Sequence, residues 1–204
     1  MRTCLLAIVG PLLIAAASLP AAAAPQSLSG SALIDALRRG GYVIVMRHAS
    51  SPREEPDAAT AEKDNVNHER QLDAAGRAAA TAMGQGFRRL RIPVAEVLTS
   101  PTYRAMETAR LAGWAAPRPM AELGDRGRNM QAVTETDGDA LRKLASGDVR
   151  DGNRVVITHM PNIARAFPTA GDVADGEALV FAPARGAAPM LVGRIKIEEW
   201  PQLQ

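Results

Sequence analysis

Two histidines in this chain follow closely on short apolar runs. Arg47 and His48 come directly after residues 42–46, and His159 comes just after residues 155–157. Short runs rich in β-branched residues predict buried strands, and ligands of open α/β sheets bind just outside the carboxyl ends of the strands. There, an arginine beside an imidazole offers a fixed positive charge next to a group that can attack an electrophile or carry a proton. Taken alone, Arg47 and His48 would be better explained as an ordinary basic pair leaving a strand, but the second histidine favours a functional site.

Helices and strands that alternate along the chain would position these histidines. Turn and capping residues mark the element ends, with Asp73 as one N-cap and Ser100, followed by Pro101, as another. The expected helices are 32–39, 74–90, 101–112, 139–145 and 161–167. The expected strands are 42–46, 94–98, 154–158, 178–182 and 190–197, the last of them at an edge. The alternation predicts a single α/β domain with a largely parallel sheet and helices on both faces.

The segment 50–67 is polar and has no period, so it predicts a long loop next to His48. Long irregular loops in compact domains are often functional or disordered. We expect this loop and the irregular stretch 114–130 to shape the pocket, although neither composition names a substrate.

Residues 1–24 have the features of a signal peptide. Arg2 supplies a positive start, 5–19 is apolar, and 21–24 offers small residues for cleavage. We expect export to the periplasm or outside the cell, followed by a single mature domain at 25–204. The alternative is an uncleaved membrane anchor, against which two prolines within the stretch argue.

Composition excludes several kinds of site. Cys4, the single cysteine, lies in the expected leader, so the mature chain has no disulfide, zinc-binding cysteine or thiol nucleophile. The formal net charge of +2 becomes +1 without Arg2, which is too small to indicate a nucleic acid or an anionic membrane as partner.

Four segments together resemble a known family. They are Arg47-His-Ala49, Arg70-Gln-Leu-Asp-Ala-Ala-Gly-Arg77, Ser100-Pro-Thr-Tyr-Arg-Ala-Met-Glu-Thr-Ala109 and Thr158-His-Met-Pro-Asn162. In this order they resemble the histidine phosphatase superfamily, also called phosphoglycerate mutase-like, and within it the exported bacterial members of the first branch. Ala49 stands where that family usually has glycine, a small steric change at a position whose side chain carries no chemistry.

The resemblance implies a three-layer α/β sandwich and a phosphomonoesterase that needs no metal or cofactor. His48 would be the nucleophile and would form a phosphohistidine intermediate. Arg47, Arg104 and His159 would bind the phosphoryl group of a small phosphorylated substrate, for example an envelope phosphate ester. This role suits the residues, because neutral imidazole attacks a phosphate dianion without charge repulsion, and guanidinium groups hold phosphate oxygens by charge-assisted hydrogen bonds.

The leaving oxygen also needs a proton, and one carboxylate can supply it and later activate water. The family usually places this group after the helix that contains Arg104. Glu122 is therefore our first candidate and Asp125 the second. Glu107, one turn from Arg104, is a weaker candidate that we expect to be an ion-pair partner.

Three further polar residues have more ordinary interpretations. We expect His68 to be a loop residue and Asn162 to serve a cap or backbone role. Arg70 could contact either the phosphate or the structure around it.

Two other function classes stay open at this point. A catalytically silent phosphate-binding module of the cell envelope would keep the same pocket. A metal-dependent hydrolase would use His48, His159 and nearby carboxylates, but no compact ligand spacing supports it.

Overall fold

The computed structural model describes residues 27–126, 132–182 and 187–204. The expected signal peptide therefore lies outside the described residues, as does the end of the stretch 114–130. Within these ranges, no helix is both long enough and apolar enough to cross a membrane.

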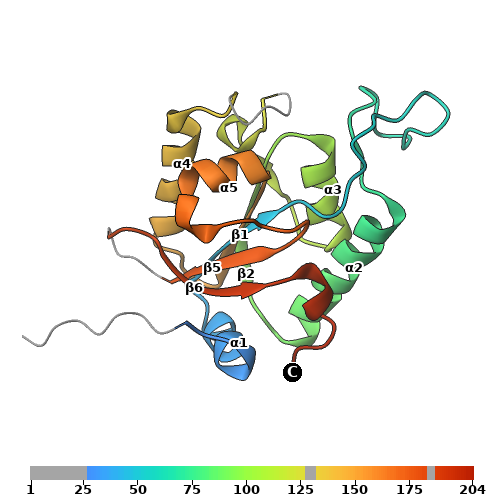
Figure 1. Ribbon diagram of the computed structural model, residues 1–204. Helices are drawn as coiled ribbons and strands as arrows, with labels where there is room; N and C mark the ends of the chain where they lie inside the picture. Colours follow the sequence, from blue (N-terminus) through green and yellow to red (C-terminus); the bar gives the residue numbers. More distant parts are fainter. Residues whose placement is uncertain (1–26, 127–131, 183–186) are drawn as a thin grey trace, which may run out of the picture.

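In the described residues, six strands form one twisted sheet in the order β3-β2-β4-β1-β5-β6 (Figure 1). Neighbours from β3 to β1 run parallel, whereas β5 and β6 are antiparallel to their neighbours. The strands are β1 (Val43–Arg47), β2 (Val94–Thr99), β3 (Arg118–Pro119), β4 (Asn153–Thr158), β5 (Ala178–Ala182) and β6 (Met190–Ile195). The expected largely parallel sheet is confirmed, with β6 at one edge.

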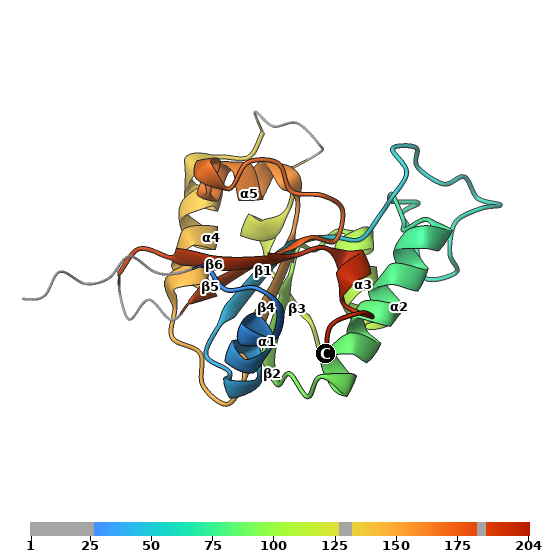
Figure 2. The ribbon, with the colours of Figure 1, turned by 60° about the horizontal axis from the view of Figure 1, so that its bottom comes forward.

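Helices cover both faces of this sheet. In Figure 2, α4 and α5 lie above the strands and α1 lies below them. The helices are α1 (Gly30–Arg39), α2 (Ala74–Arg89), α3 (Tyr103–Leu111), α4 (Glu135–Ser146) and α5 (Met160–Ala166), with short 3-10 turns η1 (Ala121–Leu123), η2 (Pro168–Ala170) and η3 (Ile197–Glu199). The α/β three-layer architecture expected from the sequence is thus confirmed.

The central strand β1 explains why the sheet needs two helical layers. Ile44 and Met46 pack into the apolar cluster formed with α1, α2 and α3. Val43 and Val45 pack into the opposite cluster with α4 and α5. Successive side chains of a strand point to opposite faces, so a strand whose first four residues are all apolar must be covered on both sides.

Two predicted helix starts are wrong, while the cap on α2 is confirmed. The Asp73 side chain accepts a hydrogen bond from the Gly76 amide at the start of α2. Ser100 is not the N-cap of α3: its amide donates to Ile157 O, so the chain is still in the sheet there, and Thr102 is the cap.

Helix α4 begins at Glu135, earlier than the expected residue 139. Thr134 and Asp137 form a reciprocal capping box there, which satisfies the first free amides of the helix. The prediction started too late because it followed the apolar periodicity rather than this polar signal.

Candidate active site

Three buried side chains meet at the carboxyl edge of the parallel strands. His48 follows β1, His159 follows the adjacent β4, and Arg104 lies in the first turn of α3. The two imidazole rings are 5.2 Å apart between centroids. Arg104 lies between them, with its Nε 3.1 Å from His48 Nε2 and a terminal nitrogen 3.2 Å from His159 Nδ1. The structure thus brings together three of the residues singled out in the sequence.

The hydrogen bonds of His48 define its reactive atom. Its Nδ1 is 2.7 Å from Ala49 O. A carbonyl oxygen can only accept, so Nδ1 must carry the proton and Nε2 is left with the lone pair. Burial, and then the nearby His159 and Arg104, lower the pKa of His48 well below 6.5. At neutral pH His48 is therefore a neutral imidazole whose Nε2 can act as a nucleophile.

His159 has the opposite tautomer. Its Nδ1 accepts from Arg104, so Nε2 carries the proton and donates to Ser100 Oγ at 2.7 Å. Burial, followed by the charges of Arg104, Arg70 and Arg47, lowers the pKa of His159 well below 6.5. Ser100 thus orients His159, a role that the sequence did not reveal.

Thr108 joins the segment after His48 to helix α3. Its Oγ1 accepts from the Ala49 amide at 3.1 Å and donates to Arg104 O at 2.8 Å. Ala49 is fully buried within the apolar cluster on the α1 side of the sheet. The methyl group that replaces the family's usual glycine is therefore accommodated in the core.

Arg47 lies at the rim of this site. Its terminal nitrogens bond to Asp175 Oδ1 at 2.7 Å and to Val173 O at 3.1 Å. Its charge nevertheless lowers the pKa of both His48 and His159. Asp175 was missed in the sequence because it belongs to no motif and reaches Arg47 only through the fold.

Of the two main carboxylate candidates, Asp125 lies in the buried cluster. It is ion-paired with Arg104, and its Oδ2 is 3.8 Å from His159 Nδ1. Glu122 is half-buried in η1, and among the described residues its carboxylate has no hydrogen-bond or ion-pair partner. The geometry therefore favours the second candidate of the sequence analysis over the first.

Glu107 is an ion-pair partner, as expected. It binds Arg77 and Arg110 and accepts from the Leu72 amide at 3.4 Å. Burial raises its pKa above the ordinary value. These contacts join α2 to α3 and leave Glu107 outside the histidine cluster.

Asn162 serves the backbone, as expected, but from within α5 rather than as a cap. Its Nδ2 donates to Glu122 O at 3.2 Å and to Gly124 O at 3.0 Å. These bonds hold the segment that carries Asp125, so Asn162 is a positioning residue.

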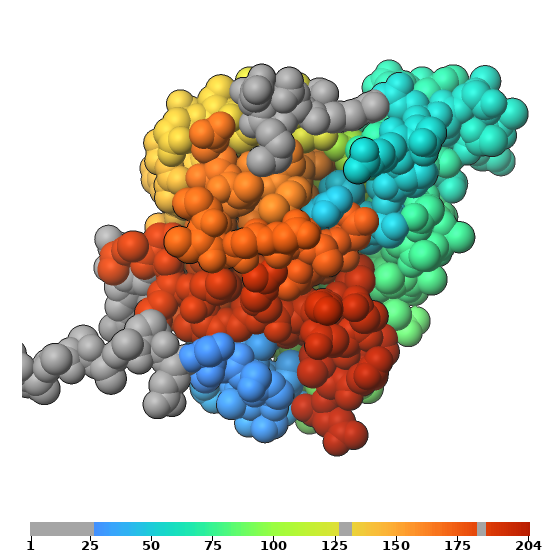
Figure 3. Space-filling model, viewed as in Figure 1, coloured from blue at the N-terminus to red at the C-terminus, as the bar shows by residue number. Residues whose placement is uncertain are grey.

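The long loop predicted after His48 is present and projects from the rest of the molecule (Figure 3). Arg70 fixes its near end by donating to Ser51 O and Pro52 O. Glu69 accepts from the Tyr103 amide at the start of α3. His68 is exposed in this loop, as expected. Arg70 therefore bonds the backbone of the loop, while its charge also lowers the pKa of His159.

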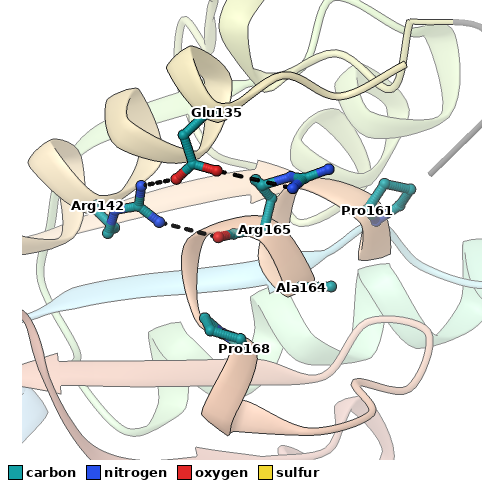
Figure 4. Close-up of a pocket in the computed structure, with 6 residues that line it drawn as sticks. All are labelled: Glu135, Arg142, Pro161, Ala164, Arg165 and Pro168. Atoms are coloured by element: carbon teal, nitrogen blue, oxygen red, sulfur yellow. Dashed lines mark hydrogen bonds and ion pairs between the residues drawn. The ribbon is translucent and has the colours of Figure 1, made fainter. Parts of the chain in front are cut away.

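A separate surface groove lies between α4 and α5 (Figure 4). Glu135 binds Arg142 and Arg165 there, and Arg142 also donates to Arg165 O. The charged groups of this groove therefore satisfy one another. Among the described residues, no group of three histidine, cysteine, aspartate or glutamate side chains is arranged to hold a metal ion.

The buried positive cluster makes a prediction about protonation. His48 and His159 should be neutral at pH 6.5, and their protonation midpoints should lie below that value, because burial and Arg104 both oppose the charged form. Imidazole resonances followed by NMR over pH would measure both midpoints. In Arg104→Gln, which removes the positive charge, both should rise. Histidines already protonated at pH 6.5 in the wild-type protein would contradict the described geometry.

Several solved structures share the fold of this chain. Similar solved structures include the protein histidine phosphatase SixA bound to tungstate, with TM-score 0.53, 16% identity, and 78% of this chain and 98% of that chain covered. A mutant phosphoserine phosphatase from Entamoeba histolytica in complex with phosphoserine has a TM-score of 0.53 and 11% identity, with 77% of this chain and 98% of that chain covered. A mycobacterial glucosyl-3-phosphoglycerate phosphatase in complex with inorganic phosphate has a TM-score of 0.51 and 15% identity, with 78% of this chain and 99% of that chain covered. At these identities the likeness concerns the fold.

A comparison with curated proteins found no match. The family model of the histidine phosphatase superfamily (branch 1) matches residues 43–159, more than half of the chain and the whole span from β1 to His159. With the strand-end histidines and Arg104 in place, this match shows that the chain belongs to the histidine phosphatase superfamily, branch 1.

Proposed function

We propose that this protein is a metal-independent phosphomonoesterase that transfers the phosphoryl group of a small substrate to His48 and then to water. The observation that carries the proposal is the buried His48, whose Nδ1 carries the proton and whose Nε2 lone pair faces Arg104 Nε. Family membership supports a phosphatase. Two of the similar structures are named for phosphate esters and one for a protein histidine phosphatase, so their names favour hydrolysis of a phosphoryl group in general and do not single out one substrate.

The first step forms a bond between His48 Nε2 and phosphorus while the bond from phosphorus to the leaving oxygen breaks. Substrate phosphate takes the place of His48 Nε2 as hydrogen-bond partner of Arg104 Nε. Arg104 and, from the rim, Arg47 then stabilise the charge that spreads over the phosphoryl oxygens, and His159 donates to the same oxygens after its ring proton moves from Nε2 to Nδ1. Because His48 starts neutral, the attack carries no repulsion between anions.

A proton must reach the leaving oxygen in this step, and we propose that Asp125 donates it, entering the step protonated once the substrate phosphate has replaced its carboxylate as the anionic partner of Arg104. In the second step the same carboxylate takes a proton from the water that attacks the phosphohistidine. Asp125 contacts the phosphate-binding Arg104, whereas the Glu122 side chain has no such contact in the described residues. Glu122 is the alternative donor.

Replacement of the nucleophile tests the proposal as a whole. His48→Ala should lower kcat on 4-nitrophenyl phosphate about a thousandfold or more, and EDTA should leave wild-type turnover unchanged. The acid-labile phosphoryl group trapped on the wild-type protein should be absent from the variant. Full activity in His48→Ala would overturn the mechanism. Phosphate binding without hydrolysis of any tested ester would instead favour a silent binding module.

The proton donor can be identified from leaving groups of different basicity. Asp125→Asn should lower kcat about a hundredfold or more on an alkyl phosphate, whose leaving oxygen needs a proton. The loss should be much smaller on 4-nitrophenyl phosphate, because nitrophenolate leaves without one.

Glu122→Gln is the matched control, since it removes a carboxylate from the same segment. It should change both rates less than about threefold. Equal losses on both substrates in Asp125→Asn would mean that Asp125 only orients Arg104. A loss in Glu122→Gln that is much larger on the alkyl phosphate than on 4-nitrophenyl phosphate would identify Glu122 as the proton donor.

We further propose that the protein acts in the periplasm or outside the cell after removal of residues 1–24. This proposal rests on the sequence of those residues. Expression in a Gram-negative host should yield protein in the periplasmic fraction whose intact mass lacks the leader. Full-length protein retained in the membrane fraction would indicate an anchor instead.

A further inference from the structure

A second group of arginines gathers at the end of the molecule opposite the two histidines. Arg38 lies in the last turn of α1, Arg89 in the last turn of α2, and Arg91 in the turn before β2. Together they line one surface pocket, here called the arginine pocket. Helices α1 and α2 end where strands begin, so the pocket lies at the amino edge of the sheet. Figure 1 places α1 and the chain end there, at the bottom of the view.

Two of these guanidinium groups are held in place by backbone carbonyls. Arg38 Nε donates to Leu90 O at 2.9 Å. Arg89 donates to Trp200 O at 2.9 Å and to Leu203 O at 3.1 Å. Trp200 is fully buried and rests on the Phe87 ring at 4.4 Å. Because these hydrogen bonds already orient the two guanidinium groups, their side chains lose less conformational freedom when they bind a ligand.

Arg91 adds a third guanidinium group to the pocket. Its φ of 55° is in the left-handed region, which glycine and asparagine tolerate better than arginine does. Among the described residues, its side chain has no hydrogen-bond or ion-pair partner. This conformation closes helix α2, where the Arg91 amide donates to Arg88 O at 3.1 Å and the Ile92 amide donates to Phe87 O at 3.0 Å. The turn thus presents a positive charge to the pocket at some conformational cost.

Little negative charge opposes this cluster. Asp35 pairs with Arg38 at 3.0 Å, but both side chains are largely exposed, and exposed pairs contribute little. The groove between α4 and α5 differs, since Glu135 binds two arginines there (Figure 4). Within the described residues, no carboxylate pairs with Arg89 or Arg91. The arginine pocket therefore keeps an excess of positive charge.

We propose that the arginine pocket binds a phosphate group, carried by a soluble phosphate or by a lipid headgroup, at a site separate from the catalytic one. Guanidinium groups match phosphate oxygens in geometry and charge. A bound lipid headgroup would hold the protein on a membrane with its carboxyl edge, and thus His48, directed away from the surface. The proposal does not depend on phosphatase activity.

Titration of the ¹⁵N-labelled protein with inorganic phosphate tests the pocket directly by NMR. Amide resonances of residues 90–92 should shift and saturate, and those near Ala49 and His159 report the catalytic site separately. Arg91→Gln should weaken phosphate binding at 90–92 about tenfold and leave the response at the catalytic site unchanged.

Arg39→Gln is the matched control. Arg39 is also exposed in the last turn of α1, but it does not line the pocket. Its loss should weaken binding less than twofold. An absence of saturable shifts at 90–92, or an equal effect of both variants, would overturn the proposal, because only diffuse surface charge would then be present.

Vesicles distinguish the two sources of phosphate. Phosphatidylglycerol is a diester, so its binding does not report monoesterase activity. If the ligand is a lipid headgroup, sedimentation with phosphatidylcholine vesicles should require added phosphatidylglycerol and fall about fivefold in Arg91→Gln. Saturable phosphate binding without vesicle binding would support the pocket and assign it to a soluble phosphate.

Discussion

The site depends on one buried guanidinium group. Arg104 is only 4% exposed and bonds both imidazoles and the Asp125 carboxylate. A charge removed from water in this way must be compensated by partners, and here those partners are the reactive groups themselves. Together with burial, the same charge lowers the pKa of His48 and His159. One residue therefore links the two imidazoles and the carboxylate and helps to keep the imidazoles neutral.

The surrounding fold keeps that guanidinium in place. Parallel pairing of β1 with β4 brings His48 and His159 to the carboxyl edge of the sheet. The chain leaves β2 at the same edge and begins α3 beside the two histidines. Thr108 bonds the Arg104 carbonyl and the Ala49 amide, while Asn162 holds the segment of Asp125. Each of these contacts uses a backbone group in the helix or loop segments that surround the carboxyl edge of the sheet. The result is a preorganised cluster of the kind that the proposed phosphoryl transfer requires, with its donors already oriented.

Charge is distributed unevenly over this fold. A formal net charge of +2 gives little sign of an anionic partner, yet Arg38, Arg89 and Arg91 converge on one pocket at the amino edge. Cations near helix C-termini are favoured by the helix dipole, and α1 and α2 end at this same edge. Opposite ends of one sheet thus carry two positive sites, one enclosing histidines and the other open to solvent.

The sequence by itself determined the α/β class, the cap at Asp73 and the edge at which His48, Arg104 and His159 meet, because these follow from local patterns and strand polarity. It placed the N-cap of α3 at Ser100, since a Ser-Pro pair usually begins a helix, whereas the Ser100 amide still bonds to Ile157 O of β4 and α3 begins at Tyr103. The choice between Asp125 and Glu122, the engagement of Arg47 by Asp175 and the arginine pocket came only from the tertiary structure. These features depend on contacts between residues far apart in the chain, whose distances no local pattern encodes.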